Sequence, residues 1–122
     1  MSQENKQIIE KVNAAFANND VDGFLALCTD DLVWRMVGEK DFKGKAAVRE
    51  FMGSGPSEAP QFTVENIIAE GDTVAAFGDM TMKGKDGTPE AYSYCDVYKI
   101  RGDKVAELIS YVVRTAASSA AA

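Results

Sequence analysis

Residues 90–114 constrain the fold of this chain more than any other stretch, because they read as two long β-strands joined by a tight turn at Arg101-Gly102-Asp103. Side chains of a strand point alternately to its two faces. The first of these strands therefore gathers a mostly aromatic stripe on one face. That face carries Tyr92, Tyr94, Asp96, Tyr98 and Ile100. A hairpin of this length predicts an extended antiparallel sheet.

Asp96 is the exception in that stripe, since it is a carboxylate among aromatic side chains. Burial in such a setting disfavours the charged form and raises the pKa of a carboxyl group. We therefore expect Asp96 to be neutral at neutral pH and able to donate a hydrogen bond to a ligand oxygen. The alternative is a structural aspartate that bonds only to a neighbouring tyrosine.

The composition narrows the possible functions. The net charge of −6 argues against a nucleic-acid or anionic-membrane surface, because both need clustered Lys and Arg. The chain contains no histidine, which excludes histidine-based triads, metal sites and proton shuttles. No metal-ligand spacing and no phosphate-binding glycine loop are present, so we expect no cofactor and no metal.

The cysteines and the hydropathy pattern indicate a cytoplasmic protein. Cys28, on an expected helix, and Cys95 lack CxxC spacing and are expected to be free thiols. No apolar run approaches the roughly 20 residues of a membrane span, and residues 1–20 have no signal-peptide pattern. We therefore expect no membrane partner.

The order of elements predicts an α+β domain. A helix is expected through Ala17, a second is capped by Asp20, and a third follows Gly44. The apolar stripe of the first helix consists of Ile8, Ile9, Val12, Ala15 and Phe16. Strands are expected at 32–37, 62–70, 73–83 and in the hairpin of 90–114. We assign residues 1–115 to one domain and expect residues 116–122 to form a disordered tail.

Four stretches in this order resemble the nuclear transport factor 2-like superfamily, particularly its SnoaL-like and ketosteroid-isomerase-like branch. They lie at 15–31, 42–52, 71–77 and 94–108. The resemblance implies a cone-shaped, cystatin-like fold in which a curved, mostly antiparallel sheet packs against three N-terminal helices. It also implies an apolar cavity for a small molecule and a homodimer formed through the outer face of the sheet.

The resemblance also assigns roles to individual residues. Asp96 matches the buried aspartate with which steroid isomerases donate a hydrogen bond to the developing oxyanion. Their general-base aspartate corresponds to Met36, and their oxyanion tyrosine to Val12. Polyketide cyclases use a histidine that has no counterpart here. Steroid isomerase activity is therefore not expected, and isomerase-, cyclase- or hydratase-type chemistry stays open beside ligand binding without turnover or a pure dimerisation role.

The lengths of the turns set the strand register and therefore determine which other side chains lie on the same face as Asp96. A two-residue turn at Asp86-Gly87 would place Asp79 opposite Tyr94, on the face of Asp96 and about 7–8 Å from it. Two carboxylates at that distance are a common basis of acid–base catalysis. A slip of one residue would move Asp79 to the other face. We therefore predict Asp79 and Asp96 as the catalytic pair.

The second hairpin has two possible registers. A three-residue turn pairs Leu108 with Asp96 and Ser110 with Tyr94, whereas a two-residue turn brings Ile109 and Tyr111 to those positions. We favour the first, which leaves Ile109, Tyr111 and Val113 as an apolar outer stripe for a homodimer. The predicted pocket-lining residues are Val12, Phe16, Trp34, Met36, Phe51, Phe77, Tyr94, Tyr98 and Ser110.

Overall fold

The fold was obtained as a computed structural model, which describes residues 2–53, 61–83 and 87–115. The helices are α1 (Ser2–Ala17), α2 (Val21–Ala26) and α3 (Lys45–Gly53). The strands are β1 (Cys28–Met36), β2 (Asp41–Lys43), β3 (Gln61–Phe62), β4 (Asn66–Glu70), β5 (Thr73–Lys83), β6 (Pro89–Arg101) and β7 (Lys104–Arg114). The tail predicted at 116–122 lies outside the described residues. No described helix is long and apolar enough to cross a membrane.

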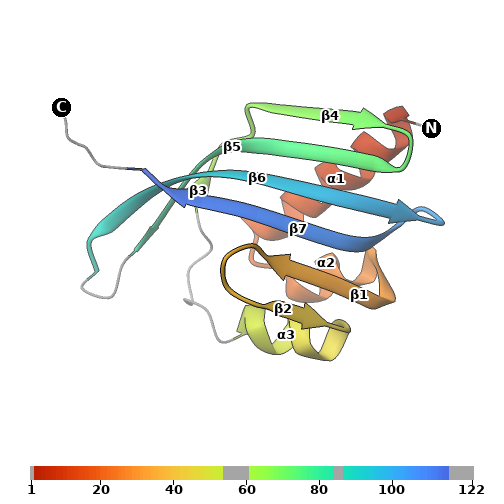
Figure 1. Ribbon diagram of the computed structural model, residues 1–122, viewed down its shortest axis with the longest axis horizontal. Coiled ribbons are helices and arrows are strands. Elements are labelled where there is room, and N and C mark those ends of the chain that lie inside the picture. The colour runs from red at the N-terminus through yellow and green to blue at the C-terminus, as the bar shows by residue number, and fades with distance from the viewer. Residues whose placement is uncertain (1, 54–60, 84–86, 116–122) are drawn as a thin grey trace.

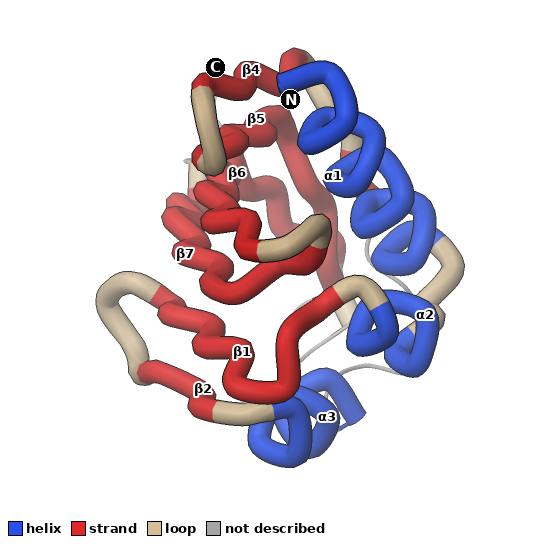
Figure 2. The backbone as a smooth tube through the Cα atoms, turned by 90° about the vertical axis from the view of Figure 1, so that its right-hand side faces the viewer, coloured by secondary structure: helices blue, strands red, loops and turns tan. Residues whose placement is uncertain are grey.

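The strands form one curved sheet in the order β2-β1-β7-β6-β5-β3, and β4 also pairs with β5. All pairings are antiparallel except that between β1 and β7. Figure 2 shows the three helices packed along one side of this sheet. The α+β fold predicted from the sequence, with helices on one face of a mostly antiparallel sheet, is confirmed.

The helix boundaries follow local signals in the sequence. α1 ends before Asn19, whose positive φ of 54° is a conformation that asparagine tolerates better than most residues. Asp20 caps α2, because its carboxylate accepts a hydrogen bond of 2.9 Å from the backbone N–H of Gly23. Within α1, Ile9, Val12 and Ala15 are buried against the sheet, as the apolar spacing predicts.

Three features of the strands differ from the sequence prediction. Cys28 begins β1 and does not belong to a helix. The short strand β2 pairs with β1 and was not predicted. The single strand predicted at 62–70 is divided into β3 and β4, because residues 63–65 cross over β5 at Gly78. There the amides of Thr63 and Glu65 bond to the carbonyls of Asp79 and Phe77.

The predicted register of β5 on β6 is wrong by one residue. Lys83 pairs with Pro89, so five residues connect the strands in place of the predicted two at Asp86-Gly87. The odd difference moves every side chain of β5 to the opposite face. Ala76 therefore pairs with Asp96, while Phe77 and Asp79 pair with Cys95 and Ser93 and lie on the outer face.

The second hairpin combines a two-residue turn with a bulge. Gly102 and Asp103 have φ values of 59° and 66°, as a tight turn with positive φ at both central residues requires. The register then shifts by one residue beyond Ile100, and this shift pairs Ser110 with Asp96. The predicted pairing of Leu108 with Asp96 is wrong. The predicted faces are correct: Ser110 shares the inner face with Asp96, and Ile109, Tyr111 and Val113 lie outside.

The core fills the end of the cone where α1, α2 and β1 meet the central strands. Tyr98, Phe24 and Leu32 are among its largest fully buried side chains. Val12 and Leu108 are also fully buried there. Because these side chains occupy one end of the cone, space for a ligand is left toward the other.

Candidate functional site

The inner face of the sheet and the helices form the walls of an open cavity of about 540 Å³. This volume falls within the range of about 300–1,000 Å³ that is usual for small-molecule sites. Most of the wall is apolar, and six aromatic residues contribute to it: Phe16, Trp34, Phe51, Phe62, Tyr92 and Tyr94. The cavity therefore suits an apolar molecule that makes few polar contacts.

Methionines form a second part of the wall. Four of the five methionines of the chain line the cavity: Met36, Met52, Met80 and Met82. Methionine side chains are flexible and polarisable, and they adapt to ligands of different outline. The wall is thus apolar without being rigid in shape.

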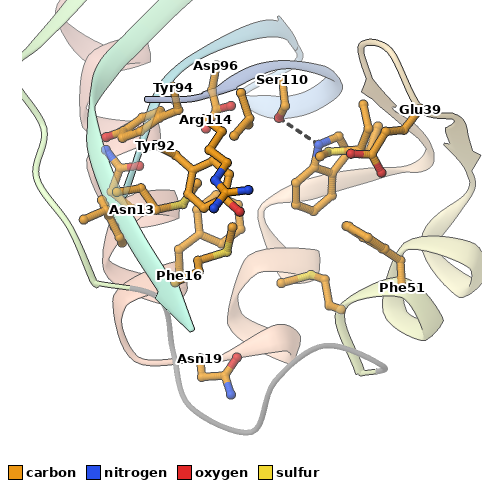
Figure 3. Close-up of a pocket in the computed structure, with 17 residues that line it drawn as sticks. Asn13, Phe16, Asn19, Glu39, Phe51, Tyr92, Tyr94, Asp96, Ser110 and Arg114 are labelled. Atoms are coloured by element: carbon orange, nitrogen blue, oxygen red, sulfur yellow. Dashed lines mark hydrogen bonds between the residues drawn. The ribbon is translucent and has the colours of Figure 1, made fainter. Parts of the chain in front are cut away.

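Asp96 lies on the central strand β6 and points into the cavity (Figure 3). Burial raises the pKa of its carboxyl group to about 6, and a hydrogen bond from the Ser110 side chain opposes this rise. The direction agrees with the sequence expectation. The extent does not, because a carboxyl group with a pKa of about 6 is mostly ionised at pH 7 and was expected to be neutral.

Ser110 lies between Asp96 and Trp34. The indole Nε1–H of Trp34 donates a hydrogen bond of 2.9 Å to the Oγ of Ser110, drawn as the dashed line in Figure 3. Met36 of β1 pairs with Ser110 of β7, which in turn pairs with Asp96 of β6. Trp34 lies two residues before Met36 on the same face of β1, so three neighbouring strands bring an indole, a hydroxyl and a carboxyl group together.

The two tyrosines on either side of Asp96, Tyr94 and Tyr98, have structural roles. The hydroxyl of Tyr94 donates a hydrogen bond of 2.8 Å to the backbone carbonyl of Thr63, and burial raises its pKa to about 12. Only the body of this side chain is then available to a ligand. Tyr98 is fully buried in the core, and its hydroxyl has no hydrogen-bond partner among the described residues.

Charged side chains occur at the far end of the β6–β7 hairpin. Arg114 lines the cavity and forms an ion pair of 3.2 Å with Glu90. The hydroxyl of Tyr92 donates a hydrogen bond of 2.8 Å to the same carboxylate. Glu39, in the turn after β1, also lines the cavity. Polar contacts with a ligand are therefore available near Asp96, near Arg114, at Glu39 and at the amide side chains of Asn13 and Asn19.

The predicted site residues divide into three groups. Seven of them line the cavity: Phe16, Trp34, Met36, Phe51, Tyr94, Asp96 and Ser110. Val12 and Tyr98 are core residues. Phe77 and Asp79 lie on the outer face, where the Asp79 carboxylate accepts a hydrogen bond of 2.9 Å from Ser93. The predicted pairing of Asp79 with Asp96 is therefore absent from this cavity.

Several lining residues were missed by the sequence analysis. Met80 and Met82 alternate with Gly78 along β5, so the correct register would have placed them on the inner face. Tyr92 belongs to the aromatic stripe that contains Tyr94, and this signal was available. Within residues 2–53, 61–83 and 87–115, no group of three or more Cys, Asp or Glu side chains is placed to hold a metal ion.

The chain matches known proteins in sequence and fold. The sequence profile of the SnoaL-like domain family matches residues 9–108. An NTF2-like protein from Burkholderia xenovorans LB400 is 25% identical with a TM-score of 0.77, over 92% of this chain and 91% of that one. No curated protein sequence gives a significant match.

Two structures with lower identity carry functional descriptions. A putative SnoaL-like polyketide cyclase from Jannaschia sp. CCS1 is 13% identical with a TM-score of 0.82, over 91% of this chain and 86% of that one. An LEH-like epoxide hydrolase from M. tuberculosis is 19% identical with a TM-score of 0.80, over 91% and 84%. At these identities the likeness shows a shared fold and leaves the reaction open.

Proposed function

The chain belongs to the SnoaL-like domain family, and from that premise we propose that it binds an apolar, oxygen-bearing small molecule and acts on it through Asp96. The observation that carries the proposal is the carboxyl group of Asp96, which faces a mostly apolar cavity and has a pKa of about 6. Acid–base catalysis is most efficient when the pKa of the group lies near the working pH. Both protonation states of Asp96 are then accessible near neutrality.

The chemistry that such a group supports is proton transfer. Ionised Asp96 accepts a proton from a hydroxyl group, or from a carbon next to a carbonyl, and returns it at a second position. Isomerisation, cyclisation and hydration all use such a transfer. The apolar walls lower the local dielectric constant and so strengthen the electrostatic effect of the carboxylate. The polyketide cyclase and epoxide hydrolase among the structural neighbours support a reaction of this class.

A second candidate function is binding without turnover. It is favoured by the position of Asp79, which the sequence analysis paired with Asp96 and which lies on the outer face. The only other carboxyl group that the described residues contribute to the cavity wall is that of Glu39, in the turn after β1. Both candidates require a ligand oxygen at Asp96 and differ only in whether the ligand is converted.

A matched pair of probes tests the contact shared by both candidates. 2-Naphthol and naphthalene have the same rings and differ by one hydroxyl group, and both are small enough for the cavity. We expect 2-naphthol to bind more tightly to the natural protein by about 1–3 kcal/mol, because its hydroxyl donates to Asp96. In Asp96→Leu this preference should disappear while naphthalene binding holds. Isothermal titration calorimetry measures both affinities.

The contrary result of that test is equally defined. If Asp96→Leu keeps the preference for 2-naphthol, the hydroxyl contacts another group and the proposed role of Asp96 is wrong. Asp79→Leu is the matched control, since Asp79 lies on the outer face and should leave both affinities unchanged.

We also propose that the protein is a homodimer formed through the outer face of the sheet. Tyr111 and Val113 on β7 remain 46% and 64% exposed, and half-buried Phe77 and Ile109 extend the same face. A continuous apolar patch on a protein surface marks an interaction site. A second copy of the chain would cover this patch with the same patch.

Substitution on that face should separate the dimer. We expect light scattering to give twice the 13.2 kDa chain mass for the natural protein and the single chain mass for Tyr111→Lys. Ala14→Lys is the control, because Ala14 is exposed on α1, on the helical side of the sheet. A natural protein that stays monomeric at micromolar concentration would rule out the proposed interface.

The cytoplasmic location expected from the sequence is part of the same proposal. Both cysteines are free thiols, as suits a reducing compartment. Cys28 is buried, and this burial raises its pKa to about 12, so its thiol is inert.

A further inference from the structure

The row of side chains beside Asp96 carries an inference that rests on the proposed function. We propose that Trp34 and Ser110 are positioning residues, which hold one carboxylate oxygen of Asp96 and leave the other oxygen to exchange the proton with the ligand. The ligand group that meets Asp96 is then a proton donor, either a hydroxyl group or an acidic C–H. A carbonyl oxygen would instead require a neutral Asp96.

The chemistry of the indole fixes the direction of the hydrogen-bond chain. An indole N–H donates and never accepts, so the Oγ of Ser110 must accept the 2.9 Å hydrogen bond from Trp34. The one hydroxyl hydrogen of Ser110 remains to be donated, and we assign it to the carboxyl group of Asp96, which is the direct partner of Ser110 across β6 and β7. The carboxyl group therefore receives a proton donor from its β7 side.

Packing keeps this chain in place. The Trp34 ring lies between aromatic side chains of three helices, with centroid distances of 6.0 Å to Phe16, 5.8 Å to Phe24 and 5.4 Å to Phe51. Ser110 is 3% exposed. Neither side chain can turn away without moving its neighbours, so the donor to Asp96 is preorganised.

A preorganised donor favours the ionised form of Asp96. Burial favours the neutral form, and the balance between the two brings the carboxyl group to titrate near neutral pH. At pH 7 Asp96 is then mainly a proton acceptor. One carboxylate oxygen of Asp96 is occupied by the hydrogen bond from Ser110. The proton from the ligand is therefore taken up by the other carboxylate oxygen, which faces the cavity.

The phenol and thiol groups beside Asp96 do not titrate near pH 6. Tyr94 and Tyr98 are neutral, because burial raises the pKa of both phenols. Cys95, on the opposite face of β6, also has a raised pKa. The lining contributed by α1, α3 and β5 is uncharged. The charged groups of the cavity wall are Arg114 on β7, paired with Glu90, and Glu39 in the turn after β1.

Two properties of the sequence make the hydrogen-bond chain from Trp34 through Ser110 to Asp96 directly observable by NMR. Trp34 is the only tryptophan, so its indole N–H gives a single, unambiguous NMR signal. The chain has no histidine, so no histidine titration overlaps with that of Asp96 near pH 6. The indole signal should therefore shift with a single midpoint near pH 6. Protonation of Asp96 changes its hydrogen bond with Ser110, and this in turn changes the hydrogen bond that the Trp34 indole donates to the Oγ of Ser110.

Substitutions distinguish an effect transmitted by the hydrogen-bond chain from a direct effect of the Asp96 charge on the indole signal. In Ser110→Ala the indole should lose this transition, while the Asp96 carboxyl signal still titrates with its midpoint raised by about 0.5–1 pH unit. Ser110→Thr keeps the hydroxyl and should restore the transition. Asp96→Asn should abolish it, and this variant gives the answer even where Ser110→Ala does not fold.

The contrary outcomes are specific. An indole transition that persists unchanged in Ser110→Ala means that Trp34 senses the charge of Asp96 directly, and overturns the proposal. A titrating Asp96 carboxyl group with no indole response in the natural protein also overturns it. Failure of 2-naphthol to bind would count against the proposed function alone, since none of these measurements needs a ligand.

Discussion

Replacing Asp96 with asparagine should stabilise the protein at pH 8 by about 2–3 kcal/mol and leave its stability below pH 4 nearly unchanged. The folded-state pKa of Asp96 is about 6, above the ordinary value of 3.8 that applies to the unfolded chain. Burial therefore disfavours the ionised carboxylate in the folded protein. The stability lost as the pH rises through about 6 is regained when the ionisable group is removed.

The direction of this pH dependence follows from proton binding. Between about pH 4 and pH 6 the folded protein holds the Asp96 proton and the unfolded chain releases it, so this residue makes stability fall with rising pH. Asparagine keeps the shape and an acceptor for Ser110, which limits other changes. Denaturant unfolding of both proteins at pH 3.5 and pH 8 measures the difference.

Asp79→Asn is the matched control for that experiment. Asp79 is an exposed carboxylate on the neighbouring strand, and its substitution should change stability by less than about 0.5 kcal/mol at either pH. An Asp96→Asn variant that is less stable than the natural protein at pH 8 would mean that ionised Asp96 is stabilising. The cavity would then hold a paired structural carboxylate.

Replacing Gly78 with alanine should destabilise the protein by about 3 kcal/mol or more. A Cβ atom at this position would overlap with the backbone carbonyl oxygen of Thr63, and backbone cannot move aside as a flexible side chain can. The same carbonyl oxygen of Thr63 accepts a hydrogen bond from the hydroxyl of Tyr94, so the clash would also disturb the cavity wall. Thermal unfolding measures the loss as a lowered melting temperature.

Gly53→Ala is the control for the Gly78 substitution. Gly53 ends α3, and among the described residues no atom lies within 4 Å of the position that its added Cβ would take. It should therefore tolerate alanine without loss of stability. Equal melting temperatures for the two variants would show that residues 63–65 do not approach β5 as closely as described. The division of one strand into β3 and β4 would then lose its explanation.

The sequence predicted the position of Asp96 well because alternation within a strand is a local property. The face that Tyr94 and Asp96 share depends only on their spacing by two residues. Ser110 was assigned to the correct face although the predicted register was wrong by two residues, since an even error preserves the face. The catalytic pairing of Asp79 failed for the corresponding reason, because its register error was odd.

The contact between Trp34 and Ser110 could not be predicted in this way. These residues are separated by 76 positions, and they meet because β1 runs parallel to β7. Hairpin reasoning applies to neighbouring antiparallel strands and gives no register for a parallel pair. The cavity itself depends on how far the core side chains fill the cone, which also follows from packing and not from pattern.

The pKa of Asp96 is the quantity on which the proposed function depends most directly. It is measured by following the Asp96 carboxyl carbon by NMR from pH 3 to pH 9 in the natural protein, with Asp96→Asn identifying the signal. We predict a midpoint near pH 6, which places an acid–base group inside the apolar cavity. A midpoint at or below about 4, the ordinary range for aspartate, would show an ionised and fully stabilised carboxylate and would contradict the account.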